Sequence, residues 1–363
     1  MKKVIIVRGA FLNPFELQNY YPLAEKFDIT AVSSKFPISE QVSLPLNKLW
    51  SPTDLPNFPF KYPILNRIFT DAHFLYNLDQ VIEGADMVHV AETYYGYTHQ
   101  TVMAKRRGLV KKIISTVWEI LPHNNEGIKG RKEFKQLARE NIDHFIAITD
   151  LAKKALLKEG VPEKKISVIG VGVDLKKFRP RTIIKKKRSI NILCVARLVP
   201  EKGVEDLMKA FLKIRERNTH VHLTFIGDGP LRHDLSGFKN VHIKKVPYRE
   251  IQNEYKNADI FCLPSRVTKT WQEQYGMCLV EAMACGLPIV TTFTGAIPEV
   301  CGDSVLYSQP MEPISLQTNL EKLIYNVELR RKMSVEARAR AVEKFDHLQV
   351  ARNLQVLYQK VCR

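Results

Sequence analysis

Short, nearly unbroken apolar runs recur along the chain and alternate with stretches of helical periodicity. The first half contains KVIIV, DITAVSS, DMVHVA, KKIISTV, HFIAIT and ISVIGVGV, and the second half contains INILCVARL, VHLTFIGDG, NVHIKKV, DIFCLPS and PIVTT. Runs of this length predict strands, and their near-continuous apolar character predicts burial on both faces. Helical patterns fall between most of the runs, for example around 130–142 and 150–159. Strands that alternate with helices are typical of parallel sheets covered by helices on both sides.

The alternation of predicted strands and helices occurs in both halves of the chain and is interrupted once, between them. The interruption, FRPRTIIKKKRS, contains a proline, is rich in charge and has no periodicity. A chain of 363 residues is also too long for one ordinary domain. We therefore predict an α/β fold of two doubly wound, Rossmann-like domains that face a central cleft. The expected divisions are a first domain over 1–178, a linker over 179–189 and a second domain over 190–344. Ligands of such sheets bind beyond the carboxyl ends of the strands.

The stretch EQYGMCLVEAMACGLP, residues 273–288, places two acids around a short apolar helix. Gly276 and the Gly286-Leu287-Pro288 stop predict a helix at roughly 276–285. This helix is apolar nearly all round and is therefore expected to be buried. A carboxylate there must be paired or hydrogen-bonded, so Glu281 needs a partner, while Glu273 lies near the helix N-terminus. Neutralisation of Glu281 by a neighbouring Arg or Lys in an ordinary core helix remains the alternative.

Two further stretches follow predicted strands of the second half. In VARLVPEKG, Arg197 follows a strand, and Lys202 precedes a helix that begins near Gly203. Two cations at a strand end and a helix entrance favour a clamp for a pyrophosphate, although surface charge in a loop is the alternative. The second stretch, IGDGP at 226–230, lacks the full GxGxxG spacing and indicates a structural turn.

Composition and charge narrow the class of protein. With 45% hydrophobic and 26% charged residues the chain is expected to be soluble and globular. No apolar run approaches the roughly 18 residues that span a bilayer, and MKKVIIVRGAF indicates a first strand. The net charge of +17 is concentrated in 101–188, where 23 Lys and Arg stand against 9 Asp and Glu. Such an excess indicates an anionic partner, either a membrane surface or nucleic acid, unless it is only a solvated face.

The cysteines and the lack of a metal-ligand motif argue against a disulfide-stabilised protein and against a metalloprotein. All six cysteines lie between Cys194 and Cys362 and none forms a CxxC pair, so we expect reduced thiols in a cytoplasmic protein. No group of metal-ligating residues has a recognisable spacing, and we predict no metal site and no cofactor.

Five motifs together resemble a known family. ARLVPEKG, FIGDGPLR, NADIFCLPS, EQYGMCLVEAMACGLPIVTT and GAIPEV occur in the order and spacing of the retaining glycosyltransferases of family 4, which have the GT-B fold and a Glu-x7-Glu motif. HFIAITDLAKKALLKEGVPEKKISVIGVGVD resembles the end of that family's N-terminal domain. KFDHLQVARNLQVLY resembles its last helix, which crosses back to that domain, so 345–363 is expected to pack there. The resemblance covers most of the chain from about residue 140 onward.

The resemblance implies a donor site in the second domain. By similarity, Glu281 would bind the ribose hydroxyls and Glu273 the hydroxyls of the transferred sugar. Arg197 and Lys202 would neutralise the diphosphate leaving group, so that Glu273, Arg197 and Lys202 form the catalytic set. Fixed cations and a helix end would stabilise the developing charge without a metal.

The backbone would complete this site. The amides of Gly276, Met277 and Cys278 would lie along the sugar and phosphates at a helix N-terminus, where anions are stabilised. The backbone near Val246 would hold the base.

The first half departs from the family in two places. RGAFLNPFELQNYY lacks the usual paired-glycine loop; instead Asn13-Pro14-Phe15-Glu16 has the form of a helix start with Asn13 as N-cap. STVWEILPH puts Trp118-Glu119 where the family commonly has a histidine, and His123 is not assumed to substitute. Asn13, Trp118 and Glu119 are therefore candidates for the acceptor or sugar side.

These observations predict a retaining, metal-independent glycosyltransferase. It would move a hexosyl unit from a nucleoside-diphosphate sugar to a glycan or lipid-linked acceptor. A further candidate partner is an anionic membrane surface, with the protein peripheral on the inner face. A sugar-nucleotide epimerase on the same fold is the alternative. A nucleic-acid-binding protein is a weaker one, because the basic segment has no aromatic interleaving and the two acids stay unexplained.

Overall fold

The computed structural model describes residues 1–181 and 189–363, and the chain separates into two compact units. The first comprises 1–171 with 347–363, and the second comprises 172–346. The first domain was expected to end at 178. Residues 172–178 instead belong to the second unit, because Val173 N donates to Phe345 O (2.8 Å) and the Phe178 ring packs 5.9 Å from that of Tyr255. Most of the predicted linker, residues 182–188, lies outside the described residues.

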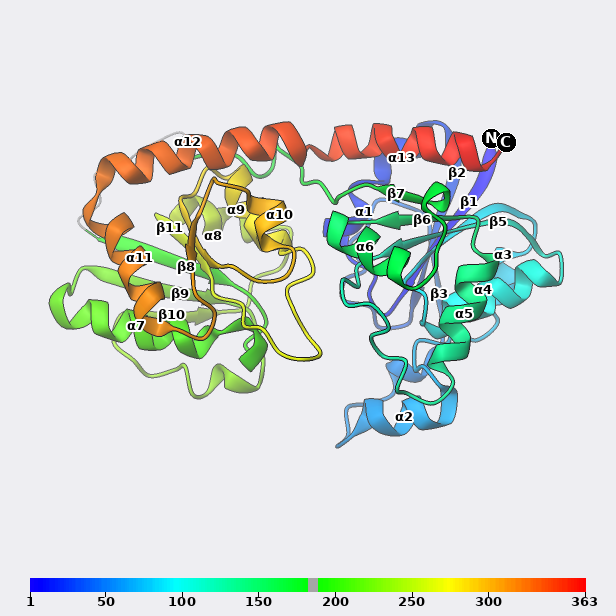
Figure 1. The fold of residues 1–363 in the computed structure, drawn as a ribbon, viewed down its shortest axis with the longest axis horizontal. Helices are drawn as coiled ribbons and strands as arrows, with labels where there is room; N and C mark the ends of the chain where they lie inside the picture. Colours follow the sequence, from blue (N-terminus) through cyan, green and yellow to red (C-terminus); the bar gives the residue numbers. More distant parts are fainter. Residues whose placement is uncertain (182–188) are drawn as a thin grey trace. The chain divides into compact units, whose positions relative to one another are not determined.

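The first unit is built on a sheet of seven parallel strands, seen in Figure 1 among the blue to green elements. The order is β3-β2-β1-β4-β5-β6-β7. The strands are β1 (Lys2–Gly9), β2 (Phe27–Ser34), β3 (Leu46–Leu49), β4 (Ala85–Ala91), β5 (Val110–Val117), β6 (His144–Ala147) and β7 (Ile166–Val168).

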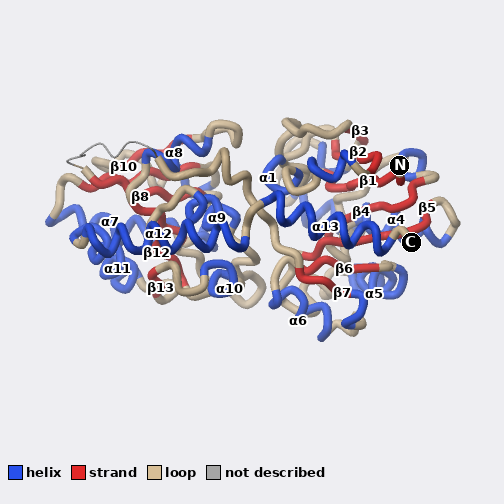
Figure 2. The backbone as a smooth tube through the Cα atoms, turned by 90° about the horizontal axis from the view of Figure 1, so that it is seen from above, coloured by secondary structure: helices blue, strands red, loops and turns tan. Residues whose placement is uncertain are grey.

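Helices cover both faces of this sheet. One face packs against α3 (Leu78–Ile82), α4 (Gly96–Arg106), α5 (Arg131–Asn141) and α6 (Asp150–Lys158). The other face packs against α1 (Pro14–Leu17), η1 (Tyr21–Glu25) and α13 (His347–Val361), which Figure 2 shows running over the strands. Val350 and Leu354 of α13 share a core with Val4 and Met87 of the sheet. The remaining helices of this unit are η2 (Pro52–Asp54), α2 (Lys61–Phe69) and η3 (Glu163–Lys165).

The second unit contains six parallel strands in the order β10-β9-β8-β11-β12-β13. They are β8 (Ile190–Val195), β9 (Val221–Ile226), β10 (Val241–Lys244), β11 (Ile260–Leu263), β12 (Ile289–Thr292) and β13 (Leu306–Ser308). The core on one face includes residues of α7 (Val204–Arg217), α11 (Pro313–Tyr325) and α12 (Val327–Lys344). The other helices are η4 (Pro200–Lys202), η5 (Pro230–Arg232), α8 (Ile251–Asn257), α9 (Met277–Ala284) and α10 (Ile297–Cys301).

The prediction of two α/β units with parallel sheets is confirmed. The short strands β3 and β13 were not predicted, because each is an edge strand of three or four residues whose sequence lacks a buried apolar run. Within the described ranges, every helix is too short or too polar to cross a membrane.

Candidate donor site at the edge of the second sheet

The loops that follow β8, β11 and β12 meet at one edge of the second sheet, because the carboxyl ends of parallel strands share an edge. The β8 loop carries Arg197 and Lys202, the β11 loop carries Ser265 and Glu273, and the β12 loop carries Gly295. This edge collects most of the residues that the sequence singled out.

A lysine and a carboxylate form the centre of the edge. Lys202 Nζ lies 2.6 Å from Glu273 Oε2, and Ser265 Oγ donates to the same oxygen at 2.7 Å. Glu273 is 6% exposed, so its charge is held largely out of water. The Lys202 ammonium also lies 4.8 Å from the centroid of the Trp271 ring. A buried, hydrogen-bonded pair of this kind fixes both charged atoms in place.

Glycines let these loops approach one another through their backbones. A Cβ on Gly203 would lie 1.9 Å from Pro264 O, and a Cβ on Gly295 would lie 2.1 Å from Glu273 O. Ala296 N donates to the same Glu273 carbonyl at 2.8 Å. Side chains at these two glycines would push the loops apart, so the placement of Glu273 depends on them.

The short helix α9 begins and ends where the sequence predicted. Gly276 is its N-cap with φ of 79°, and Cys285 is its C-cap. Gly276 is the residue that allows this turn, because a left-handed backbone disfavours other residues. Met277 and Cys278 are half-buried in the first turn, where the free amides of a helix favour an anion.

The buried acid of α9 has a partner, as its burial requires. Tyr255 OH donates to Glu281 Oε2 at 2.6 Å, and the charge of the neighbouring Lys177 also acts on this carboxylate. Burial raises the pKa of Glu281 to about 7, against hydrogen bonds from Tyr255 and Tyr248 and the charge of Lys177 that lower it. Its charge therefore depends on what binds beside it.

Lys177 and Tyr248 lie beside this acid. Lys177 Nζ donates to Tyr248 O at 2.9 Å and lies 4.1 Å from the centroid of the Tyr248 ring. Burial lowers the pKa of Lys177, against the charge of Glu281. Val246 is half-buried in the loop after β10, two residues before Tyr248.

Arg197 is not pre-assembled with Lys202 into a clamp for an anion. Its side chain is 64% exposed and bonds to Glu201 Oε1 at 3.2 Å, whereas Lys202 bonds to Glu273. Each predicted phosphate-binding cation is thus held by a carboxylate. The local reason is the helical turn η4, which brings Glu201 back toward Arg197 at i,i+4 spacing.

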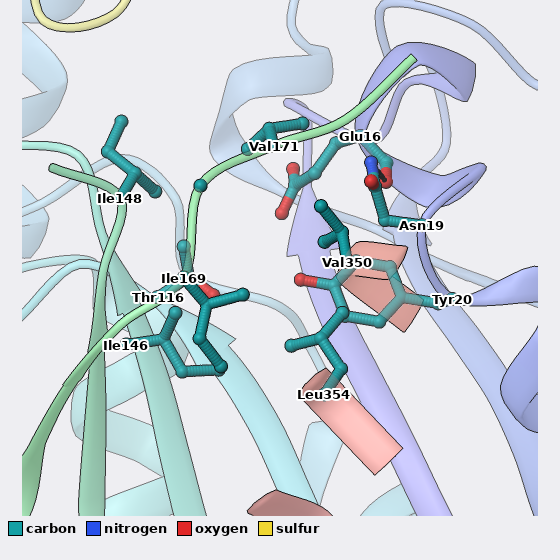
Figure 3. A pocket seen from close by; sticks show the side chains of 11 residues that line it. Glu16, Asn19, Tyr20, Thr116, Ile146, Ile148, Ile169, Val171, Val350 and Leu354 are labelled. Carbon is teal, nitrogen blue, oxygen red and sulfur yellow. Dashed lines mark hydrogen bonds between the residues drawn. The ribbon is translucent and has the colours of Figure 1, made fainter. Parts of the chain in front are cut away.

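In the first unit, the predicted helix start at Asn13 is confirmed. Asn13 caps α1 and accepts a hydrogen bond from Glu16 N at 2.8 Å, with Pro14 in the first helical turn. The Glu16 carboxylate bonds to the buried Arg8 guanidinium at 2.7 Å. Figure 3 shows Glu16 and Tyr20 beside a cavity of about 10 Å³, room for about one water molecule. Asn13 is therefore part of a buried polar network.

Trp118 and Glu119 are anchored by another acid, Glu92, which the sequence reasoning missed. Glu92 Oε1 accepts from the amides of Trp118 (2.8 Å) and Glu119 (3.2 Å), while no described residue donates to its buried Oε2. Burial, followed by the charge of Glu119, raises the pKa of Glu92 to about 8. Glu119 itself accepts from Leu121 N at 2.9 Å and from Asn124 Nδ2 at 2.7 Å.

His123 belongs to a different cluster. In the described ranges, His123, Glu126 and Glu159 have potential metal-ligand atoms within 4.8 Å of one another. Lys135 bonds to Glu159 at 2.6 Å, and Arg139 bonds to Glu126 at 3.3 Å. These cations already neutralise the acids, so we interpret the cluster as an ion-pair network. The expected absence of a metal stays a prediction.

Some residues that complete the two sites were given no role from the sequence. Ser265 ends the predicted strand DIFCLPS, and its bond to Glu273 was not foreseen. The contacts of Lys177, Tyr248 and Tyr255 with Glu281 join segments far apart in the chain and have no local pattern. Glu92 carries the same pattern as Glu119, an acid placed just after an apolar strand.

Comparisons with known proteins agree with this architecture. The model of Glycosyltransferase Family 4 matches residues 26–177, and that of Glycosyl transferases group 1 matches residues 176–340. The chain is 30% identical to the MMP alpha-(1->4)-mannosyltransferase of Mycolicibacterium hassiacum over 62% of its length and 56% of that protein. It is 22% identical to the phosphatidylinositol N-acetylglucosaminyltransferase gpi3 subunit of Schizosaccharomyces pombe, over 88% of its length and 68% of that protein.

Solved structures show the same fold. The crystal structure of Anabaena HepE in complex with UDP and glucose matches with a TM-score of 0.78 at 16% identity, covering 99% of this chain and 100% of that one. The chain spans about half the length of the first curated relatives that it matches. Two consecutive family models, together covering residues 26–340, and the shared fold lead to one assignment: the chain belongs to the GT-B glycosyltransferases.

Proposed function

We propose that the protein transfers a hexosyl unit from a nucleoside-diphosphate sugar to a glycan or lipid-linked acceptor, with retention of configuration and without a metal. The observation that carries the proposal is the donor edge, where the Lys202–Glu273 pair and the N-terminus of α9 occupy one edge of the sheet. The complexes of HepE with UDP and glucose, on the same fold, support a nucleotide sugar as the donor.

In this proposal Lys202 and Arg197 move to the diphosphate when the donor binds. Lys202 is bonded to Glu273 at 2.6 Å, and Arg197 lies exposed one loop turn away. An arriving diphosphate would draw both cations, and Glu273 would turn its carboxylate to the sugar hydroxyls. The two cations and the helix amides would then stabilise the departing nucleoside diphosphate, which is the role that a metal would otherwise fill.

Glu281 would bind the ribose. Its Oε2 is held by Tyr255 OH at 2.6 Å, and its raised pKa of about 7 lets it act as donor or acceptor toward a pair of hydroxyls. The backbone near Val246 and Tyr248 is the proposed place of the base.

The acceptor is proposed to bind the first unit, near the loops that carry Asn13 and Trp118-Glu119. The excess of positive charge in 101–188 favours an acceptor held in an anionic bilayer, with the protein peripheral on that surface. The name of the fission yeast relative, which acts on phosphatidylinositol, agrees with a lipid-linked acceptor.

Incubation with a panel of nucleoside-diphosphate hexoses and acceptors tests this function. We expect release of the nucleoside diphosphate only when an acceptor is present, and NMR of the product should show the anomeric configuration of the donor. Glu328→Ala serves as a control and should behave like the wild type, because Glu328 is 79% exposed at its side chain and pairs with Arg331 on the surface of the second unit. Turnover without acceptor, with the product still nucleotide-linked, would indicate the epimerase instead.

A further inference from the structure

One short segment of the first unit turns its apolar side chains to solvent. The α2 segment, defined here as residues 58–69, exposes six large apolar side chains. They are Phe58, Phe60, Tyr62, Ile64, Ile68 and Phe69, with Phe60 at 77% and Ile68 at 67% exposure. Figure 1 shows α2 at the margin of this unit, outside the helices that cover its sheet. Soluble monomers rarely expose so many contiguous apolar side chains, and such patches usually mark an interaction site.

The polarity of this helix is inverted relative to an ordinary surface helix. Lys61 is 7% exposed, and its Nζ donates to Thr53 O at 2.8 Å. Asn66 Oδ1 accepts from Ala72 N at 3.0 Å, and Leu65 is the one large apolar side chain of the helix that is buried. Polar bonds therefore hold α2 to the unit, while most of its apolar residues point away. This arrangement presents apolar surface outward in a fixed orientation.

The α2 segment itself carries no negative charge. Residues 55–70 contain no acid, and Arg67 is exposed. The two flanking acids are occupied: Asp54 accepts from the Ser51 amide at 2.8 Å, and Asp71 bonds to Arg131 at 2.8 Å. No free negative charge of the segment would therefore oppose an anionic partner.

Basic residues of α5 extend this charge. A Cβ on Gly130 would lie 2.8 Å from Thr70 Oγ1, so the start of α5 lies against the C-terminal end of α2. Lys129 and Lys132 flank this contact and are exposed, as is Glu133, so the three side chains leave an excess of positive charge. An apolar patch bordered by lysines is complementary to an anionic lipid surface, whose acyl region accepts the aromatic and branched side chains and whose headgroups attract the lysines.

We propose that the α2 segment is the element by which this protein docks on anionic lipid bilayers. Phe60 and Ile68 enter the boundary between headgroups and acyl chains, and Lys129 and Lys132 contact the headgroups. The inference rests on the lipid-linked acceptor of the proposed function, and it assigns the contact to a specific apolar element instead of to the basic charge of 101–188 in general.

Flotation with vesicles tests the proposal, using phosphatidylcholine alone and phosphatidylcholine with phosphatidylglycerol. The wild type should float with the anionic vesicles and not with the neutral ones. The double variant Phe60→Ser/Ile68→Ser should bind at least tenfold more weakly. Lys129→Glu/Lys132→Glu should also bind more weakly, with a difference that shrinks in high salt.

The matched control is Ile314→Ser/Val335→Ser, which removes apolar side chains that are 78% and 70% exposed in the second unit. This control should float like the wild type. Equal flotation of Phe60→Ser/Ile68→Ser and wild type, or no flotation of the wild type, overturns the proposal. A wild-type dimer that this double variant converts to a monomer also overturns it, because the patch would then bind a second copy.

Failure of the docking inference can be distinguished from failure of the proposed function. Binding of nucleoside diphosphates by Phe60→Ser/Ile68→Ser should equal that of the wild type, because the donor edge lies in the other unit. Flotation without any glycosyl transfer would leave the docking inference standing and remove the proposed function. Transfer to a lipid-linked acceptor, with flotation of the double variant equal to that of the wild type, would support the proposed function and overturn the docking inference.

Discussion

Replacing Glu273 with alanine removes the carboxylate that holds Lys202, and its effects on stability and on turnover can be measured separately. The side chains are 8% and 15% exposed and their charged atoms are 2.6 Å apart. Breaking a buried pair typically destabilises a protein by about 3–5 kcal/mol, because the remaining charge is left unpaired. Since Lys202 keeps some exposure and the Trp271 ring at 4.8 Å, we expect about 3 kcal/mol. Glu273→Gln keeps an acceptor oxygen and should lose about half as much.

The effect on the reaction should differ from the effect on nucleotide binding. Lys202 is released in Glu273→Ala, so affinity for a bare nucleoside diphosphate should stay the same or rise. A lost charge-assisted hydrogen bond to the sugar, about 1.5–3 kcal/mol, should lower turnover by roughly 10- to 150-fold. Urea unfolding, isothermal titration calorimetry and steady-state kinetics measure the three quantities, with Glu328→Ala as the control.

A specific result would refute this reasoning. If Glu273→Ala weakened binding of the bare nucleoside diphosphate as strongly as Glu281→Ala, the two acids would not divide sugar and nucleotide between them. A double-mutant cycle with Lys202→Ala isolates the pair itself, and additive effects would show that the 2.6 Å contact contributes nothing.

Three further predictions concern stability. Gly203→Ala should destabilise far more than Gly237→Ala: both glycines have positive φ, but only at Gly203 would the new Cβ meet a backbone oxygen, at 1.9 Å; equal urea midpoints would contradict this. Glu92→Gln should gain stability relative to wild type as pH rises from 5 to 8. The folded acid keeps its proton up to a pKa of about 8, so unfolding becomes easier by up to about 1.4 kcal/mol per pH unit above the ordinary pKa of 4.5; a pH-independent difference would contradict the burial of that proton. Glu119→Gln should lower stability by about 1–3 kcal/mol, because one acceptor oxygen becomes an NH2 group that cannot accept from Asn124 Nδ2; unchanged thermal unfolding would show that this bond is unimportant.

The sequence predicted local features well where periodicity and capping residues determine them. The bounds of α9 follow from Gly276 and Gly286, and the cap at Asn13 follows from the Asn-Pro-x-Glu pattern. That Glu281 needs a partner also follows from the sequence alone, because an isolated buried charge is unstable.

The identity of each partner did not follow from the sequence. Lys202 and Glu273 are 71 residues apart, and Tyr255 and Glu281 are 26 apart on different helices. Such pairs depend on strand order and on loop packing, which local pattern does not specify. The same limit explains why Arg197 and Lys202 were expected to act together although each bonds to a different acid.

The sequence also did not predict that the apolar side chains of the α2 segment are exposed. The stretch that contains Phe60 and Ile68 mixes apolar with polar residues, and only the structure shows Lys61 turned inward and the apolar side chains outward. The period of a pattern gives a face, but tertiary packing decides which face is buried.

Titration of nucleoside diphosphates into the wild type and Arg197→Ala tests the donor edge most directly. The Arg197 side chain is 64% exposed, and within the part of the chain that the structure describes its guanidinium bonds to Glu201 alone, so its removal should leave the fold intact. We predict that at least one of the uridine, guanosine and adenosine diphosphates binds the wild type, that Arg197→Ala binds it at least tenfold more weakly, and that Glu328→Ala binds it equally. Failure of every nucleoside diphosphate and its hexose conjugates to bind the wild type, or equal binding by Arg197→Ala, would contradict a donor site at this edge.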